Sequence, residues 1–285
     1  MTQAPVVQLL PPDALNGVRV GLSVSESADL PRLGLMETHF QLALGEIARC
    51  VLGASGELAY GGALRPDGYT LFLAQEVHRF SRPTQPLSVY LSWAEHRALG
   101  LSAIDTQRRA IGMFGKVICL DADGADVDAT LGRSESPAPE MDPQVVERAL
   151  TSLRRRMAAE TMGRVLIGGR RSGYLGRMPG VVEEALLSIE KGQPIYLAGG
   201  FGGVTLDIIG ALGIDDIGWL PVLTGSSDRG LSDGLQALAV AASGGLAANG
   251  LNADENRQLA RTYRPSEIAT LVSLGLGRLA GAISA

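Results

Sequence analysis

Three short apolar runs in the sequence each end in paired glycines, and this pattern predicts a binding site. The runs read LAYGG at residues 58–62, VLIGG at 165–169 and YLAGGFGG at 196–203. Such runs predict buried strands, and ligands of open α/β sheets bind beyond the carboxyl ends of the strands. Glycine there lets backbone N–H groups reach phosphate oxygens, assisted by a following helix N-terminus. The loops therefore predict a phosphate- or ribose-bearing ligand. The alternative is that their glycines serve only tight turns and close helix packing.

The second loop continues into the segment with the densest set of polar side chains, residues 168–184. It holds three arginines, a residue type suited to phosphate recognition, together with a tyrosine and further glycines. Glu183 and Glu184 follow the pair Pro179-Gly180 in the first turns of an expected helix. A carboxylate there can hold ribose hydroxyls or act as an acid or base. The alternative is that both glutamates only complement the helix dipole.

Polar residues after the first two expected strands complete the candidate site. Ser23 lies near the end of the first expected strand and Ser25 and Glu26 follow it, and the three offer hydroxyl and carboxylate groups. Arg65 and Asp67 follow the second expected strand, where a salt-bridged loop is the alternative. The expected ligand-binding residues are Ser23, Ser25, Glu26, Gly61, Gly62, Arg65, Asp67, Gly168, Gly169, Arg170, Arg171, Gly173, Tyr174, Arg177, Pro179, Gly180, Glu183, Glu184, Gly199, Gly200, Phe201, Gly202 and Gly203.

Several standard motifs are absent from the sequence. It has no G-x-x-x-x-G-K-[ST] loop, no G-x-G-x-x-G after the first expected strand and no G-x-S-x-G elbow. An ordinary P-loop enzyme, Rossmann dehydrogenase or α/β-hydrolase is therefore disfavoured. Cys50 and Cys119 lie in unrelated segments and the three histidines are scattered, so neither a disulfide framework nor a metal site is expected.

The elements that must position these residues alternate between strand and helix. Strands are expected at residues 18–24, 57–60, 87–91, 116–120, 164–167 and 195–198. Helices are expected at 33–52, 69–80, 143–162, 181–191, 204–212, 231–242, 255–262 and 265–279, with 93–111 helical or mixed. This alternation predicts a mostly parallel sheet with helices on both faces. We expect one α/β domain over residues 1–285, with a mobile loop at 121–142 and a helical C-terminal part at 213–285.

Composition limits the classes of partner. The net charge is −5 and the pI is about 5.3, which gives no sign of a nucleic-acid binder. The chain start lacks a signal-peptide pattern and no run of about 18 apolar residues occurs, so a cytoplasmic protein without a membrane span is expected. The apolar, small-residue stretch at 235–248 predicts self-association into a homo-oligomer.

The order of these glycine loops, with Pro179-Gly180 and Glu183-Glu184 after the second, resembles the SLOG superfamily over about residues 17–212. That group includes the LOG-type phosphoribohydrolases, the DNA-processing A proteins and nucleotide-sensing domains of bacterial defence proteins. The resemblance implies a Rossmann-like fold and a nucleotide-type ligand such as NAD, ADP-ribose or a cyclic ADP-ribose. It also implies a sensor or signalling role, with homo-oligomers common and a separate effector protein as a possible partner.

The resemblance carries an enzymatic alternative, which is N-glycosidic hydrolysis of a nucleotide of the LOG type. Glu183 or Glu184 would then act at the ribosyl carbon, and Arg155, in the run Arg154 to Arg156, would hold the phosphate. The sequence departs from the LOG signature, because Val181-Val182 stands where that signature has Gly-Thr before its glutamate. This departure favours the ligand-sensing branch of the superfamily over the hydrolases.

Overall fold

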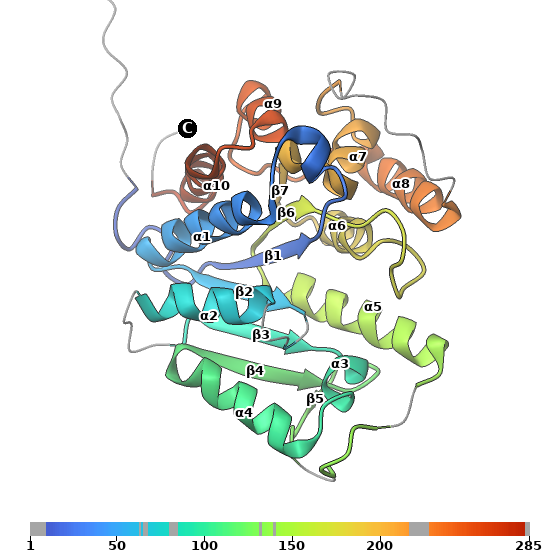
Figure 1. The fold of residues 1–285 in the computed structure, drawn as a ribbon. Helices are drawn as coiled ribbons and strands as arrows, with labels where there is room; N and C mark the ends of the chain where they lie inside the picture. Colours follow the sequence, from blue (N-terminus) through green and yellow to red (C-terminus); the bar gives the residue numbers. More distant parts are fainter. Residues whose placement is uncertain are drawn as a thin grey trace, which may run out of the picture.

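A computed structural model describes residues 10–62, 64, 68–79, 85–130, 133–138, 141–216 and 228–282. Its described strands form one sheet in the order β5-β4-β3-β2-β1-β6-β7 (Figure 1). Their bounds are β1 Arg19–Ser25, β2 Glu57–Gly61, β3 Leu87–Leu91, β4 Gly115–Leu120, β5 Asp126–Val127, β6 Gly163–Gly168 and β7 Ile195–Ala198. Every neighbouring pair is parallel except β4 and β5. The expected α/β, Rossmann-like architecture is therefore confirmed.

Helices cover both faces of this sheet. Their bounds are α1 Glu37–Gly53, α2 Tyr69–Arg79, α3 Trp93–Arg97, α4 Leu101–Ile111, α5 Pro143–Glu160, α6 Gly180–Glu190, α7 Gly203–Ala211, α8 Arg229–Ala241, α9 Ala253–Arg261 and α10 Pro265–Leu279. On one face α1 packs between α2 and α10; on the other α6 packs between α5 and α8. Because parallel strands point the same way, the carboxyl ends of β1, β2, β3 and β6 meet at one edge of the sheet (Figure 1).

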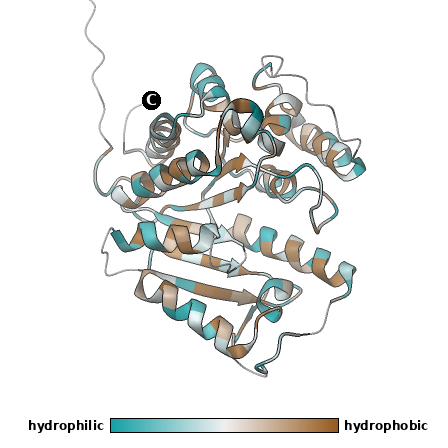
Figure 2. Cartoon of the chain, in the orientation of Figure 1, coloured by the Kyte–Doolittle hydropathy of each residue, from teal (hydrophilic) through white to brown (hydrophobic). Residues whose placement is uncertain are grey.

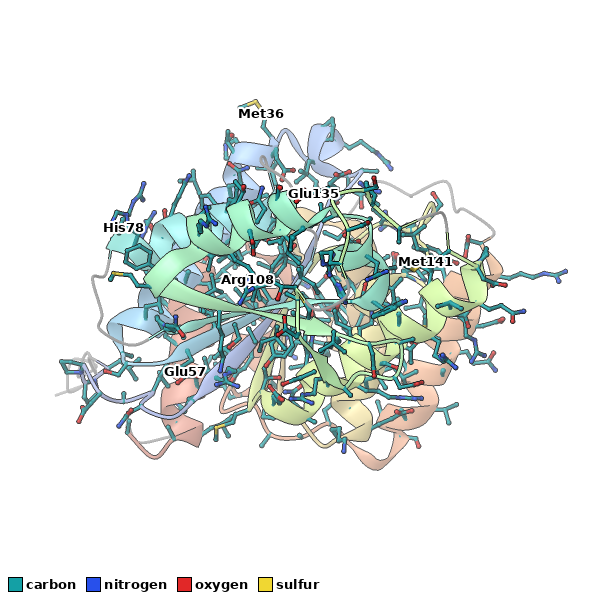
Figure 3. All side chains as sticks on the ribbon, turned by 90° about the horizontal axis from the view of Figure 1, so that it is seen from below. Met36, Glu57, His78, Arg108, Glu135 and Met141 are labelled. Atoms are coloured by element: carbon teal, nitrogen blue, oxygen red, sulfur yellow. The ribbon has the colours of Figure 1, made fainter. Side chains whose placement is uncertain are left out.

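Apolar side chains fill the spaces between the sheet and the two helical layers. The strands are the most continuously hydrophobic elements, as expected for a sheet buried on both faces (Figure 2); all five residues of β3 are buried. The larger core lies under α1, α2 and α10, and a second cluster joins α6, α7 and α8 to β6 and β7. Figure 3 shows the interior filled by side chains, whereas Met36, which is 63% exposed, stands out from the surface.

The structure differs from the sequence-based expectation at two places and refines it at residues 93–111, which were expected to be helical or mixed. The helix expected from residue 33 begins at Glu37, because Gly34 adopts a left-handed φ of 69° that ends a preceding 3-10 turn. The region 93–111 is two helices, α3 and α4, and a Cβ on Gly100 between them would lie 2.0 Å from the Glu135 carbonyl oxygen. The expected loop 121–142 includes the short strand β5.

No helix in the described ranges combines the length and the hydropathy needed to cross a membrane.

Candidate functional site

A cavity of about 270 Å³ opens at the carboxyl ends of β1, β2 and β6. It is lined by Val24, Ser25, Tyr60, Gly61, Gly62, Glu95, Leu150, Arg154, Arg170, Gly173, Tyr174, Leu175, Gly180, Val181 and Glu184. We call this the strand-end cavity. Its walls come from the ends of β1 and β2, the loop after β6, Glu95 of α3, α5 and the start of α6, so residues more than 100 positions apart in the sequence meet there. This is the edge of the sheet at which the sequence predicted a ligand.

The first glycine pair builds the wall beside α5. A Cβ on Gly61 would lie 2.6 Å from the Met157 sulfur and 2.9 Å from a Leu153 methyl group. A Cβ on Gly62 would meet the Tyr60 ring at 2.6 Å. The two glycines therefore let α5 approach the sheet and let the Tyr60 ring lie over the loop, and both effects shape the strand-end cavity.

The N-terminus of α6 faces the same cavity. Pro179 occupies the N-cap position without a side-chain capping hydrogen bond, and Gly180 and Val181 line the cavity. A Cβ on Gly180 would lie 2.7 Å from Nη2 of Arg154, so glycine makes room for the buried guanidinium at this helix end. Uncapped peptide N–H groups beside a guanidinium form an environment that favours an anion.

The two glutamates of α6 have different surroundings. Glu183 accepts a hydrogen bond from the Thr151 hydroxyl at 2.5 Å and another from Nη1 of Arg154. These contacts occupy both of its carboxylate oxygens on the α5 side. Glu184 instead lines the strand-end cavity, with one oxygen 3.8 Å from Nε of Arg154 and the other 3.4 Å from Nη1 of Arg164. Only Glu184 is therefore placed to meet a ligand.

Arg164, on strand β6, contacts Glu184 from the interior of the protein. Its side chain is fully buried, and Nη1 donates to the Ser23 hydroxyl at 3.0 Å as well as facing Glu184. Burial lowers the pKa of Arg164, and the Glu184 charge opposes this effect. Gly21, opposite Arg164 in the β1–β6 pairing, leaves space for the guanidinium. Ser23 therefore holds Arg164 and does not line the cavity.

Two polar side chains stand at the mouth of the cavity. Arg170 pairs with Glu26 at 2.7 Å, and both are largely exposed. The Tyr174 hydroxyl donates to Asp228, the residue whose side chain caps α8 through the Leu231 N–H at 2.9 Å. Burial and the hydrogen bond to Asp228 raise the pKa of Tyr174 to about 12, so its hydroxyl is a donor at neutral pH. Tyr174 thus joins the cavity to the first turn of α8.

The third glycine loop, residues 199–203, is closed by the protein's own side chains. A Cβ on Gly202 would lie 2.5 Å from Asp29, and the Gly203 N–H donates to the Asp29 carboxylate at 2.7 Å. A Cβ on Gly199 or Gly200 would meet the backbone of Ala260 or Thr262 at 2.5 Å or less. The Asp29 carboxylate thus occupies the position at the start of α7 where an anionic ligand was expected, and this loop does not line the strand-end cavity.

Arg171 belongs to the same closed network. It donates to both oxygens of Asp207, at 2.6 and 3.0 Å, and to Asp29 at 2.8 Å. Burial lowers the pKa of Arg171, but its hydrogen bonds with the two carboxylates outweigh this effect and raise it. Burial raises the pKa of Asp207, and the pairing with Arg171 offsets part of that increase. Arg171 was expected to bind phosphate and instead ties β6 to α7 and the Asp29 loop.

The expected site residues thus divide into three groups. Those that line the strand-end cavity are Ser25, Gly61, Gly62, Arg170, Gly173, Tyr174, Gly180 and Glu184. Those described but placed outside its lining are Ser23, Glu26, Gly168, Gly169, Arg171, Arg177, Pro179, Glu183, Gly199, Gly200, Phe201, Gly202 and Gly203. Arg65 and Asp67 lie outside the described residues.

The arginine that meets the glutamates is Arg154, not Arg155. Arg155 is exposed and lines a separate depression with Arg177 and Glu147. The sequence held a signal for this difference. Arg154 lies four positions after Leu150 and three before Met157, so helical periodicity places it on the buried face of α5. Glu95 and Leu150 also line the cavity without having been expected there.

A comparison with protein-family models matches the chain to the family described as SLOG cluster2 over residues 14–259. No curated protein and no solved structure matches the chain. The matched range includes all seven strands and every residue that lines the strand-end cavity.

Proposed function

Because the chain belongs to the SLOG cluster2 family, which indicates a nucleotide-related function, we propose that the strand-end cavity binds a nucleotide-derived ligand of the NAD, ADP-ribose or cyclic ADP-ribose type. In this proposal the protein is a cytoplasmic sensor or signalling domain, of the kind used in bacterial defence. Binding would change its assembly or the activity of a separate effector protein.

The observation that carries the proposal is the meeting of complementary polar groups in one cavity. The uncapped start of α6, Arg154 and Arg170 supply positive potential for a phosphate. Glu184 supplies carboxylate oxygens that can accept hydrogen bonds from a ribose diol. The volume of about 270 Å³ is close to the lower end of the range for small-molecule sites.

The surroundings of the glutamates favour binding over N-glycosidic hydrolysis. Glu183 is held by Thr151 and Arg154, so its oxygens are engaged within the protein. Glu184 lies between two guanidinium groups and is suited to accepting hydrogen bonds. Hydrolysis would require one carboxylate to activate water or to stabilise the ribosyl cation, and the neighbouring positive charges oppose the second of these roles.

The contact between Tyr174 and Asp228 offers a route from ligand to output. Tyr174 lines the cavity, and Asp228 caps α8. A ligand that displaces the Tyr174 ring would alter the hydrogen bonding of this cap. The start of α8 is therefore the element whose stability we expect to depend on occupancy.

The test is thermal unfolding of the wild-type protein with NAD, ADP-ribose, cyclic ADP-ribose and AMP, each mixture also being analysed for products by chromatography. A ligand present at about 100 times its dissociation constant stabilises the folded state by about 2.7 kcal/mol. We expect stabilisation without turnover, and we expect Arg170→Ala and Glu184→Gln to abolish it. The matched control is Arg177→Ala, which removes an exposed arginine outside the cavity.

Two outcomes contradict the proposal. Release of free base that Glu184→Gln abolishes would assign the cavity to nucleotide hydrolysis. If none of the nucleotides stabilises the protein, the glycines of these loops serve only tight turns and close packing.

A further inference from the structure

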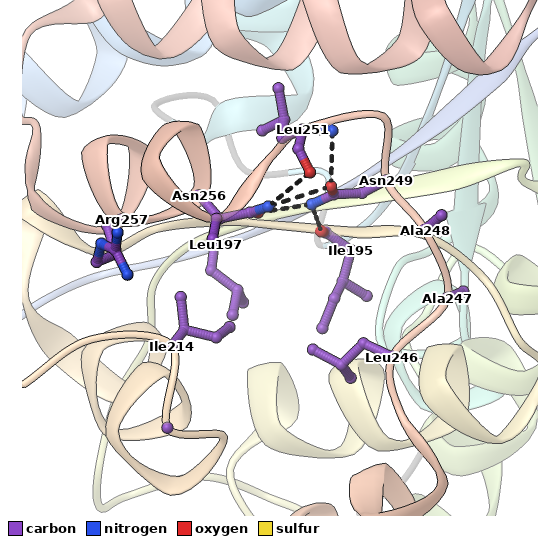
Figure 4. Close-up of a pocket in the computed structure, with 12 residues that line it drawn as sticks. Ile195, Leu197, Ile214, Leu246, Ala247, Ala248, Asn249, Leu251, Asn256 and Arg257 are labelled. Carbon is purple, nitrogen blue, oxygen red and sulfur yellow. Dashed lines mark hydrogen bonds between the residues drawn. The ribbon is translucent and has the colours of Figure 1, made fainter. Parts of the chain in front are cut away.

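A second and larger cavity, of about 380 Å³, lies beside the edge strand β7, and nothing in the proposed function uses it. Its lining combines strand β7, the turn after α7, the segment 246–251 and the start of α9 (Figure 4). The side chains of Ile195, Leu197, Ile214 and Leu246 point toward one another there. We call it the edge-strand cavity. The two cavities share no lining residue among those described.

The backbone of β7 supplies polar groups to this cavity. The Arg164 N–H donates to the Pro194 carbonyl, so the even-numbered residues of β7 face β6. Ile195 faces the other way, and its carbonyl accepts a hydrogen bond from Nδ2 of Asn249 at 3.0 Å. Because backbone direction alternates along a strand, both the N–H and the C=O of Leu197 face the same side as the Ile195 carbonyl. No turn, loop or side chain in the described part of the chain hydrogen-bonds to these two groups.

The asparagines of the cavity build its wall. Asn249 Nδ2 also donates to Asn256 Oδ1 at 2.8 Å, and Asn249 Oδ1 accepts from the Leu251 N–H at 3.0 Å. Asn256 Nδ2 donates to the Leu251 and Asn252 carbonyls at 3.1 and 2.9 Å (Figure 4 shows the first). These amides are engaged with the protein, and the half-exposed Arg257 pairs with Asp254. Among the polar groups of β7 at this cavity, the Leu197 N–H and C=O are the ones left to a ligand.

We propose that the edge-strand cavity binds a flat heterocycle of the purine type. Such a base carries a hydrogen-bond donor next to an acceptor, and this pair matches the outward C=O and N–H of one strand residue. Its faces would lie against the aliphatic side chains of Ile214 and Leu246. An acyl chain fits the apolar walls less well, because it would bury the Leu197 N–H and C=O without partners.

The test is calorimetric titration of the full chain with adenine and N6,N6-dimethyladenine, both methylated at N9 to remove the ring N9–H donor, and with decanoate. We expect the adenine to bind and its dimethyl analogue, which then has no N–H donor, to bind at least about tenfold more weakly, because it leaves a polar group of the site unpaired. Ala248→Trp fills the cavity from an exposed lining residue and should abolish adenine binding. The matched control Ala239→Trp, at an exposed position of α8 outside the lining, should retain it.

The outcomes separate this site from the strand-end cavity. Adenine binding that survives Glu184→Gln and is lost in Ala248→Trp supports the inference, whatever the nucleotide experiments show. Loss in Glu184→Gln with retention in Ala248→Trp would place the base in the strand-end cavity and overturn it. Binding of decanoate but not adenine would overturn the assigned ligand class, and binding of neither would overturn the site.

Discussion

The neighbours Arg154 and Arg155 differ entirely in surroundings, and this difference controls the chemistry of α5. The Arg154 side chain is 11% exposed and donates to Glu183, whose side chain is 9% exposed. Arg155 lies about 100° around the helix from Arg154 and is exposed. A difference of one position along α5 therefore decides that Arg154 lines the strand-end cavity and Arg155 does not.

We expect Arg154→Ala to lower the free energy of unfolding by about 3 to 5 kcal/mol, because it leaves the buried Glu183 carboxylate without its cation. Arg155→Ala, the matched control, should change it by about 0.5 kcal/mol or less. Urea denaturation of both variants measures the difference. If the two variants lower the free energy of unfolding equally, the ion pair between Arg154 and Glu183 does not stabilise the folded state.

His96 is the residue at which stability should depend on pH. Its Nε2 lies 2.9 Å from the Leu120 carbonyl and its Nδ1 lies 2.6 Å from Nη2 of Arg133. The carbonyl can only accept and the guanidinium can only donate, so the ring is neutral with its proton on Nε2. Burial lowers the pKa of His96 to about 4, and the neighbouring Arg133 adds to this effect.

The pKa of His96 is therefore lower in the folded state than in the unfolded state, where it is about 6.5. We expect the His96 contribution to stability to be complete above pH 6.5 and to fall as the pH decreases toward 4. Urea denaturation between pH 7.5 and 4 measures this. The variant His96→Gln retains a donor and an acceptor but does not titrate in this range, so the loss of stability between pH 6.5 and pH 4 should be smaller. If His96→Gln loses as much stability as the wild-type protein, other groups cause the pH dependence.

At the scale of elements, the glycines act mainly through helix packing. Gly61 lets α5 lie against the end of β2, and Gly180 lets Arg154 lie against the start of α6. The glycines of the third loop also allow close packing, and there the neighbouring group is the Asp29 carboxylate, which accepts a hydrogen bond from the Gly203 N–H. Paired glycines after a strand therefore indicate a close approach of the backbone to a neighbouring group, and at the third loop that group is the protein's own Asp29 carboxylate.

We expect Gly61→Ala to lower the free energy of unfolding by about 1 to 3 kcal/mol, because the added methyl group overlaps Met157 and Leu153. Gly53→Ala is the matched control. Gly53 ends α1 and has no atom within 4 Å of its Cβ position, so alanine there should stabilise by up to about 1 kcal/mol. Thermal unfolding of both variants gives the comparison, and a neutral Gly61→Ala would show that α5 moves away at no cost.

At the scale of the whole molecule, one sheet joins strands from Arg19 to Ala198, with β2 as its middle strand and β1 between β2 and β6. The expectation of a single domain is compatible with this sheet and stays a prediction, as do the mobility of residues 121–142 and the cytoplasmic location. The two cavities lie on different parts of the same sheet, at its strand ends and at its β7 edge.

Self-association belongs to this scale. The stretch 235–248 includes exposed apolar positions, with Val240 67% and Leu246 38% exposed. We expect light scattering at micromolar concentration to give a mass of at least twice the 29.8 kDa chain, and Val240→Glu to reduce it toward one chain. The exposed position Met113, 71% exposed on the far part of the sheet, provides the control variant Met113→Glu. A wild-type mass of one chain would contradict the prediction.

The sequence by itself determined every described strand except the short β5, most helix bounds and the edge of the sheet where the strand-end cavity lies. Those features follow from local periodicity and from the rule that parallel strands end at a common edge. It did not reveal that Asp29 closes the third glycine loop, since that hydrogen bond joins Asp29 to Gly203 across 174 positions. It also gave no sign of the edge-strand cavity. These depend on which surfaces pack together, and only the tertiary structure decides that.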